Sequence, residues 1–254
     1  MSQYSEHSGI DLILRVRVRD PKSADNSHGV GVMESIHRVI AALAAVAGMT
    51  ACNSSKPAAS AAAAGAGAGP VTYVAALQPL NTSTTGLQTS GEARIVVNGD
   101  SLTITTNVKG VAPGMTHLQH FHGFADNRDA ICPTAAADTN HDGVIDIHET
   151  EPMVGVTMVP FTSDPVSMQI VTNTYPTAGA DGSFTYSKTV SLAALDSAFK
   201  KTFNGSDLDI AGRVVMIHGI PDSTKLKSSV SSLGKIPAQV TIPIACGKLV
   251  KQGS

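Results

Sequence analysis

The sequence contains no tryptophan, and phenylalanine, tryptophan and tyrosine together make up only 4% of the chain. Alanine, glycine, serine, threonine and valine dominate instead, and turn residues recur at short intervals. This composition favours many short strands over long helices. An all-β protein is therefore expected.

Charge of either sign is also scarce. The chain has 18 basic and 20 acidic side chains, so its formal net charge is −2. A balance of this kind offers no broad basic surface for nucleic acid, and we expect no nucleic-acid partner. No nucleophile–base pattern, glycine-rich phosphate loop or basic–aromatic stripe stands out. The functional residues must belong to another kind of site.

The one apolar run near the N-terminus, Val39 to Met49, is too short to cross a bilayer, which takes ~20 residues. Arg38 precedes the run, and small residues lead from it to Cys52. This order is typical of a secretory signal, and a cysteine at the cut resembles a bacterial lipobox. The alternative is an ordinary buried helix followed by an incidental cysteine.

The lipobox interpretation divides the chain into four parts. Residues 1–32 are an over-extended gene start, with Met33 as the working start, and 33–51 are the signal peptide. Residues 52–70 hold the lipidated Cys52 and an Ala/Gly/Ser tether that has nothing to bury. Residues 71–254 are the folded domain. The protein is thus predicted to be exported and anchored by lipid to the bacterial cell envelope, on its periplasmic or outer face.

Two cysteines remain after Cys52 is assigned to the lipid, namely Cys132 and Cys246. In an exported protein, two remaining thiols most simply form one disulfide. The bridge would close a loop of more than a hundred residues. In the chain-entropy model such a loop stabilises the fold by roughly 4–5 kcal/mol.

Strand signals recur from Val71 onward, and Asn98-Gly99 between two of them is a hairpin signal. The only predicted helix is Leu192 to Phe203. This density of strands predicts one antiparallel sandwich or barrel. Outside the histidine-rich segment described next, strands are predicted at 71–78, 91–98, 101–108, 154–159, 166–172, 183–192, 208–218 and 238–245.

Five of the nine histidines lie between Met115 and Glu149, and three of them form the pattern H-x-x-H-x-H. On a strand, His120 and His122 share one face, whereas His117 points to the other. Two imidazoles on one face can chelate a metal ion, and His117 could support them from behind. The alternative is a pair of half-exposed surface histidines.

Later segments complete a pattern that resembles the copper–zinc superoxide dismutases over about residues 71–250. His117 to His122 match that family's first copper-binding strand, including its supporting histidine. Cys132 and Cys246 fall where the family has its disulfide, and His218 ends a strand that carries a later copper ligand. Asp181-Gly182 matches a turn into a middle strand. The opening strands also resemble chordin-type (CHRD-like) domains of bacterial exported proteins.

The resemblance implies a Greek-key β-sandwich or barrel with one disulfide. It also implies a copper site formed by His120, His122 and His218, with His117 supporting it. Three imidazoles suit Cu(II), which heads the affinity order for such ligands. Two functions follow. The protein either dismutes the small anion superoxide, or holds copper and calcium as a non-catalytic structural or metal-buffering protein.

The sequence departs from the family in two places. An oxygen-rich loop occupies the segment that carries the family's bridging histidine and zinc ligands, so zinc is not expected. His141 or His148 in this loop could supply a fourth copper ligand, although neither spacing matches. The family's arginine, which guides superoxide, is replaced by Pro243. Without a nearby cation, electrostatic steering worth roughly ten- to a thousand-fold in rate is lost.

The oxygen-rich loop, residues 138–149, fits the twelve-residue EF-hand pattern, with Gly143 at the sharp turn. A hard cation takes six or more oxygens, and this spacing supplies them from one loop. Pro152 is expected to limit the following helix to about one turn, so we predict a lone structural calcium site. The alternative is a polar loop rich in Asx turns. The predicted ligands are Asp138, Asn140, Asp142, the Val144 carbonyl, Asp146 and Glu149.

Overall fold

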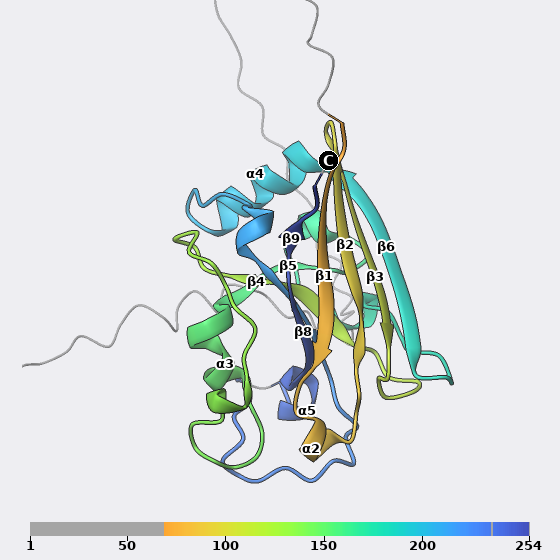
Figure 1. Ribbon diagram of the computed structural model, residues 1–254, viewed down its shortest axis with the longest axis vertical. Coiled ribbons are helices and arrows are strands. Elements are labelled where there is room, and N and C mark those ends of the chain that lie inside the picture. Colours follow the sequence, from red (N-terminus) through yellow and green to blue (C-terminus); the bar gives the residue numbers. More distant parts are fainter. Residues whose placement is uncertain (1–68, 235, 254) are drawn as a thin grey trace, which may run out of the picture. The chain divides into compact units, whose positions relative to one another are not determined.

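The computed structural model describes residues 69–234 and 236–253. The predicted signal peptide, the predicted lipidation site Cys52 and nearly all of the predicted tether lie outside these residues. Within them the chain is mainly antiparallel β-structure (Figure 1). The strands are β1 Val71–Pro79, β2 Ser90–Asn98, β3 Ser101–Lys109, β4 Leu118–Gly123, β5 Val156–Pro160, β6 Ser183–Ser191, β7 Val214–His218, β8 Pro243–Lys248 and β9 Val250–Lys251.

The strands hydrogen-bond in the order β5-β4-β7-β8-β1-β2-β3-β6, and β9 pairs with β1. Figure 1 shows β1, β2, β3 and β6 running side by side as long strands. Strands that are distant in sequence become neighbours where β7 returns to β4 and β6 to β3. These are Greek-key crossovers. The predicted all-β class and its agreement with a superoxide dismutase-like fold are confirmed.

β1 joins two ladders. Its first part pairs with β2, and its last residues pair with β8. Side chains alternate across each strand, so one face of every ladder packs into a common core. The largest cluster of buried residues includes Ile95 of β2, Ile104 of β3, Phe121 of β4 and Ile217 of β7, all fully buried. Because Phe121 points into this core, its neighbours His120 and His122 point to the opposite face of the sheet.

The predicted disulfide is confirmed. Cys132 and Cys246 are bonded, and their Cα atoms are 5.7 Å apart. The bridge clips the long β4–β5 connection onto β8. Cys246 pairs with Met216 of β7, which in turn pairs with His120 of β4. The disulfide therefore lies in the same cross-strand row as one of the candidate metal ligands.

The helices correct several sequence predictions. The predicted helix is present as α4, Leu192–Thr202, but two others were missed: α2 Thr82–Thr85 and α5 Ala238–Thr241. The helix after the oxygen-rich loop is α3, Ile147–Val154, and Pro152 lies inside it, so the prediction of a single turn was wrong. Pro152 cannot donate to the His148 carbonyl, and its ring crowds that carbonyl. The capping box of Asp146 and Glu149 stabilises the start of α3.

Three predicted strands also differ. Residues 166–172 form no strand, because the chain there makes the 3₁₀ turns η2 Pro165–Ser167 and η3 Thr172–Thr174. The stretch 238–245 begins as α5 and becomes a strand only at Pro243. Likewise β7 starts at Val214, after the 3₁₀ turn η4 Ile210–Gly212. A fourth 3₁₀ turn, η1 Ala135–Ala137, precedes the oxygen-rich loop.

Candidate metal centre

Three histidines converge on the outer face of the β4–β7 ladder. His120 and His122 stand two residues apart on β4, and His218 ends β7 opposite Leu118. One nitrogen atom of each ring lies within 4.8 Å of the corresponding atoms of the other two. The ring centroids are 4.7 Å apart for His120–His218, 5.0 Å for His120–His122 and 5.5 Å for His122–His218. These separations allow all three nitrogens to reach a single ion.

The hydrogen bonds of the three rings leave one nitrogen of each available. His218 donates its Nδ1–H to the Thr241 carbonyl at 2.7 Å, and its buried Nε2 has no partner. His122 donates its Nδ1–H to the Gly155 carbonyl at 3.4 Å, so its Nε2 carries a lone pair, and the contact of that nitrogen is a long one of 3.5 Å with the Thr157 hydroxyl. The buried Nδ1 of His120 also has no partner. Unpaired buried polar atoms are costly, and a bound metal would satisfy them.

The surroundings hold these imidazoles in the neutral form. Burial lowers the pKa of His122 to about 3 and that of His218 to about 4. Burial, and then the neighbouring His218 and His122, lower the pKa of His120 well below 6.5. Two or three positive charges cannot share so small and dry a space. At neutral pH the rings therefore present lone pairs, as metal ligation requires.

We expect the metal-free protein to lose stability in acid. An unfolded chain protonates these histidines near pH 6.5, whereas the native state does not protonate His218 until about pH 4 or His122 until about pH 3. Between those values the unfolded state binds more protons. Each histidine then lowers the free energy of unfolding by up to ~1.4 kcal/mol per pH unit. Urea unfolding from about pH 7 to about pH 4 measures this slope, and His218→Gln should flatten it. Equal slopes would contradict the expectation.

His117 lies behind the cluster. Its ring is fully buried and stacks on Phe184 of β6, with the ring centroids 5.9 Å apart. Its Nδ1 is 3.1 Å from the His218 carbonyl, and its Nε2 is 3.2 Å from the Ala112 carbonyl. His117 thus contacts the backbone of a candidate ligand from the opposite face. Its location agrees with the supporting role that the resemblance implies.

Loops cover the cluster. The exposed fraction of each candidate ligand is only 3–4%. Tyr175, in the β5–β6 connection, stands edge-on to His120 with ring centroids 6.4 Å apart, and its buried hydroxyl has no hydrogen-bond partner. Tyr175 packs with Leu118 and Ile170, while Met216 and the disulfide lie on another side. The site is enclosed by apolar side chains.

In the part of the chain that the structure describes, no arginine hydrogen-bonds to the three histidines at the place where the resemblance implies a cation. Pro243 pairs with His218 at the position in question. The buried Arg213 uses its guanidinium elsewhere. It donates to the carbonyls of Leu208, Phe124 and Asp207 and to the Asn127 side chain. These bonds fix the loops at the start of β7, so Arg213 holds the backbone together and has no donor directed at the three histidines.

His141 and His148 do not join the cluster. Among the described residues, the His120–His122–His218 group is the only set of three or more His, Cys, Asp or Glu side chains close enough to share an ion. His141 is exposed and has a left-handed backbone conformation. His148 is exposed on α3, where it lines a separate pocket of about 330 Å³. Neither residue is in place as a fourth ligand.

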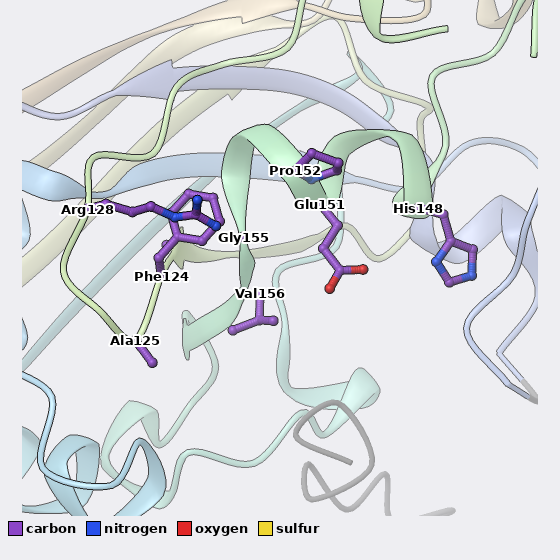
Figure 2. A pocket seen from close by; sticks show the side chains of 9 residues that line it. Phe124, Ala125, Arg128, His148, Glu151, Pro152, Gly155 and Val156 are labelled. Atoms are coloured by element: carbon purple, nitrogen blue, oxygen red, sulfur yellow. The ribbon is translucent and has the colours of Figure 1, made fainter. Parts of the chain in front are cut away.

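Figure 2 shows this pocket, whose lining includes Gly123, the residue that follows His122 on β4. His148 and Glu151 project from α3, and the guanidinium of Arg128 lies 3.7 Å from the centroid of the Phe124 ring. Gly155 also lines the pocket, and its carbonyl faces His122. A Cβ atom at Gly155 would lie within 2.1 Å of the Gly123 carbonyl oxygen. Only glycine therefore allows this approach to the ligand strand.

The oxygen-rich loop is closed by its own hydrogen bonds. Asp138 accepts from the amides of Asp142 and Gly143, and Glu149 folds back to accept from those of Thr139 and Asn140. Gly143 has a φ of +90°, as a sharp turn demands. The carboxylates nevertheless do not gather as closely as the three histidines do. Calcium binding stays a prediction.

Sequence reasoning missed three residues that contact the cluster: Thr241, Gly155 and Tyr175. Thr241 acts through its backbone carbonyl, which any residue type could supply, so the sequence carries no signal for it. Gly155 also acts through its carbonyl, and only its lack of a Cβ atom is specific to the position. The position of Tyr175 depends on the path of the β5–β6 connection. Residues 166–172 of this connection were predicted as a strand, and that prediction was wrong.

No family model matches the chain, and no curated protein matches it. Solved structures do. A double mutant of a SOD-like protein from Bacillus subtilis matches with 19% identity over 70% of this chain and 96% of its own, at a TM-score of 0.38. A SOD-like protein from Bacillus subtilis matches with 16% identity over 71% of this chain and 99% of its own, at a TM-score of 0.34. Similarity at this level assigns neither a metal nor an activity to the present chain.

The residues that the structure describes include no helix that is both long and apolar enough to span a membrane.

Proposed function

We propose that this protein binds one copper ion through His120, His122 and His218. One observation carries the proposal. His120 and His218 each have a buried ring nitrogen without a hydrogen-bond partner, and both residues belong to one three-histidine cluster. Neutral imidazoles prefer borderline metals, and Cu(II) binds such ligands more tightly than Zn(II) does. Copper bound here would supply one-electron chemistry through its Cu(II) and Cu(I) states.

Holding the ion is better supported than turning over superoxide. The ligands are almost fully covered, and the position of the guiding arginine is Pro243. Dismutation, in which two superoxide ions and two protons give oxygen and hydrogen peroxide, is the second candidate. Its support is the three-histidine cluster, together with the contact between His117 and the His218 carbonyl. The protein itself would contribute ligand geometry and the exclusion of water.

One experiment separates these functions. The oxidised full chain is loaded with one equivalent of Cu(II), and its EPR spectrum and superoxide dismutation rate are recorded together. His120→Ala/His218→Ala tests the site, and His141→Ala removes an exposed histidine as a control. We expect a nitrogen-ligated signal that only the double variant loses, with no turnover above that of free copper. Fast turnover would establish the enzyme, and an unchanged signal in the double variant would refute the site.

We further propose that loop 138–149 binds calcium. Support comes from the EF-hand spacing and from the return of Glu149 to the start of the loop. We expect calcium at a hundredfold excess over its Kd to add about 2.7 kcal/mol to the free energy of unfolding. Thermal melts in calcium and in excess EDTA measure the difference. Asp138→Asn should abolish the effect, whereas Asp164→Asn, at an exposed site outside the loop, should keep it. Identical melts of the unsubstituted protein would exclude the calcium site.

We also propose that Cys52 carries a lipid that anchors the protein to the cell envelope. The proposal rests on the apolar run and small residues before Cys52 and on the low-complexity segment after it. Expression in a bacterial host followed by membrane fractionation tests it. The chain should sediment with membranes, and Cys52→Ser should release it. A chain that stays soluble in both cases would exclude the anchor.

A further inference from the structure

The oxygen-rich loop is joined to the connection between β7 and β8, which runs from Gly219 to Ile242. Three residues of this connection donate hydrogen bonds to the loop, each 2.6 Å long. Two donate from side chains and one from its backbone amide. The contacts are Lys227 Nζ to the Asp142 carbonyl, Ser229 Oγ to the Asp142 carboxylate and the Ser231 amide to the Asp146 carboxylate.

A second link runs through Asn81, which follows β1. Its Nδ2 donates to the carbonyls of Ile145 and Pro243, at 3.0 Å each, and its Oδ1 accepts from the Ile145 amide at 2.8 Å. Ile145 belongs to the oxygen-rich loop, and Pro243 begins β8. Pro243 pairs with His218. One buried amide therefore connects the loop to the strand position beside a candidate metal ligand.

The other end of the connection holds His218 directly. Thr241 accepts the Nδ1–H of His218, and the Gly219 and Ile220 amides donate to the carbonyls of Ile242 and Gln239. The orientation of the His218 ring therefore depends on where this connection lies. In metal sites, the partner of the non-ligating ring nitrogen fixes both the tautomer and the orientation of the ring.

We infer that Lys227 and Ser229 are positioning residues for His218, acting by bracing the β7–β8 connection against the oxygen-rich loop. The inference rests on the proposed copper site. Neither residue touches the three histidines, and both are exposed, so each is free to change without opening the core. Their shared partner is Asp142, which is buried. Removal of a group that hydrogen-bonds a ligand histidine directly typically costs 10–100-fold in metal affinity, and Lys227 and Ser229 act through the connection, so the lower end of that range is expected.

The test compares two double variants. Lys227→Met/Ser229→Ala removes both side-chain contacts to Asp142. Lys225→Met/Ser228→Ala makes the same chemical changes at exposed neighbours that form no side-chain hydrogen bond among the described residues, and it serves as the control. Cu(II) affinity is measured by chelator competition. The exchange rate of the His218 Nδ1–H proton is measured by NMR in the metal-free protein.

In the Lys227→Met/Ser229→Ala variant we expect about tenfold weaker Cu(II) binding and faster exchange of the His218 ring proton. The control should match the unsubstituted protein in both. Unchanged affinity and unchanged exchange in the Lys227→Met/Ser229→Ala variant would overturn the inference, as would equal effects in the control. If the unsubstituted protein binds no copper, the proposed function fails. The exchange rate of the His218 ring proton still tests whether Lys227 and Ser229 position His218, because this measurement needs no metal.

Discussion

Replacing His218 by alanine is expected to weaken Cu(II) binding about 10²–10³-fold. Structural zinc sites with four protein ligands bind with apparent free energies of ~10–16 kcal/mol, or about 2.5–4 kcal/mol per ligand. A loss of 1.4 kcal/mol is a tenfold loss in affinity. The two remaining imidazoles, His120 and His122, are adjacent on one strand and can still chelate an ion weakly. Chelator competition against the unsubstituted protein measures the loss.

The comparison with His141→Ala makes this result specific. His141 is exposed and lies outside the cluster, so its removal should leave the affinity for Cu(II) unchanged. His218→Ala should also remove part of the EPR signal's nitrogen coupling, because one of three nitrogens is lost. An affinity that fell equally in both variants would show that copper binds scattered surface histidines. The centre described above would then be wrong.

The second large effect concerns the disulfide. Reduction, or the variant Cys132→Ser/Cys246→Ser, should lower the free energy of unfolding by roughly 4–5 kcal/mol, because the bridge joins residues 114 positions apart. For a domain of this size, 1 kcal/mol corresponds to a Tm change of about 2–4 °C. A fall in Tm of roughly 8–20 °C is therefore expected. Calorimetry with and without reductant measures it.

The disulfide also holds a connection that contacts the metal centre. The β4–β5 connection carries Cys132, and the Gly155 carbonyl at its end orients His122. Releasing the clip frees that connection from β8. The variant Cys132→Ser alone should match the double variant, since either change opens the same loop. A Tm within about 2 °C of the oxidised protein would show that the loop stays in place without its bridge.

The strands were the most predictable part of the fold. In β2, β3 and β6, alternation of inward and outward side chains follows directly from the backbone period of two, and these elements lie where they were predicted. The stretch 166–172 failed because an apolar run also suits a connection that covers a sheet. Met168 and Ile170 are buried there without forming a strand. Periodicity cannot separate these two environments.

The sequence by itself determined the residue types of the candidate site. Once the segment is a strand, the spacing of His120 and His122 places both rings on one face, and the two cysteines left after Cys52 pointed to the single bridge. The resemblance implied that His218, almost a hundred residues later, joins them, and the tertiary structure brings the three rings together. It also decided that His141 and His148 do not, and that the carbonyls of Thr241 and Gly155 orient the rings. The physical reason is that strand pairing fixes which distant residues are neighbours, and backbone carbonyls carry no signature in the sequence.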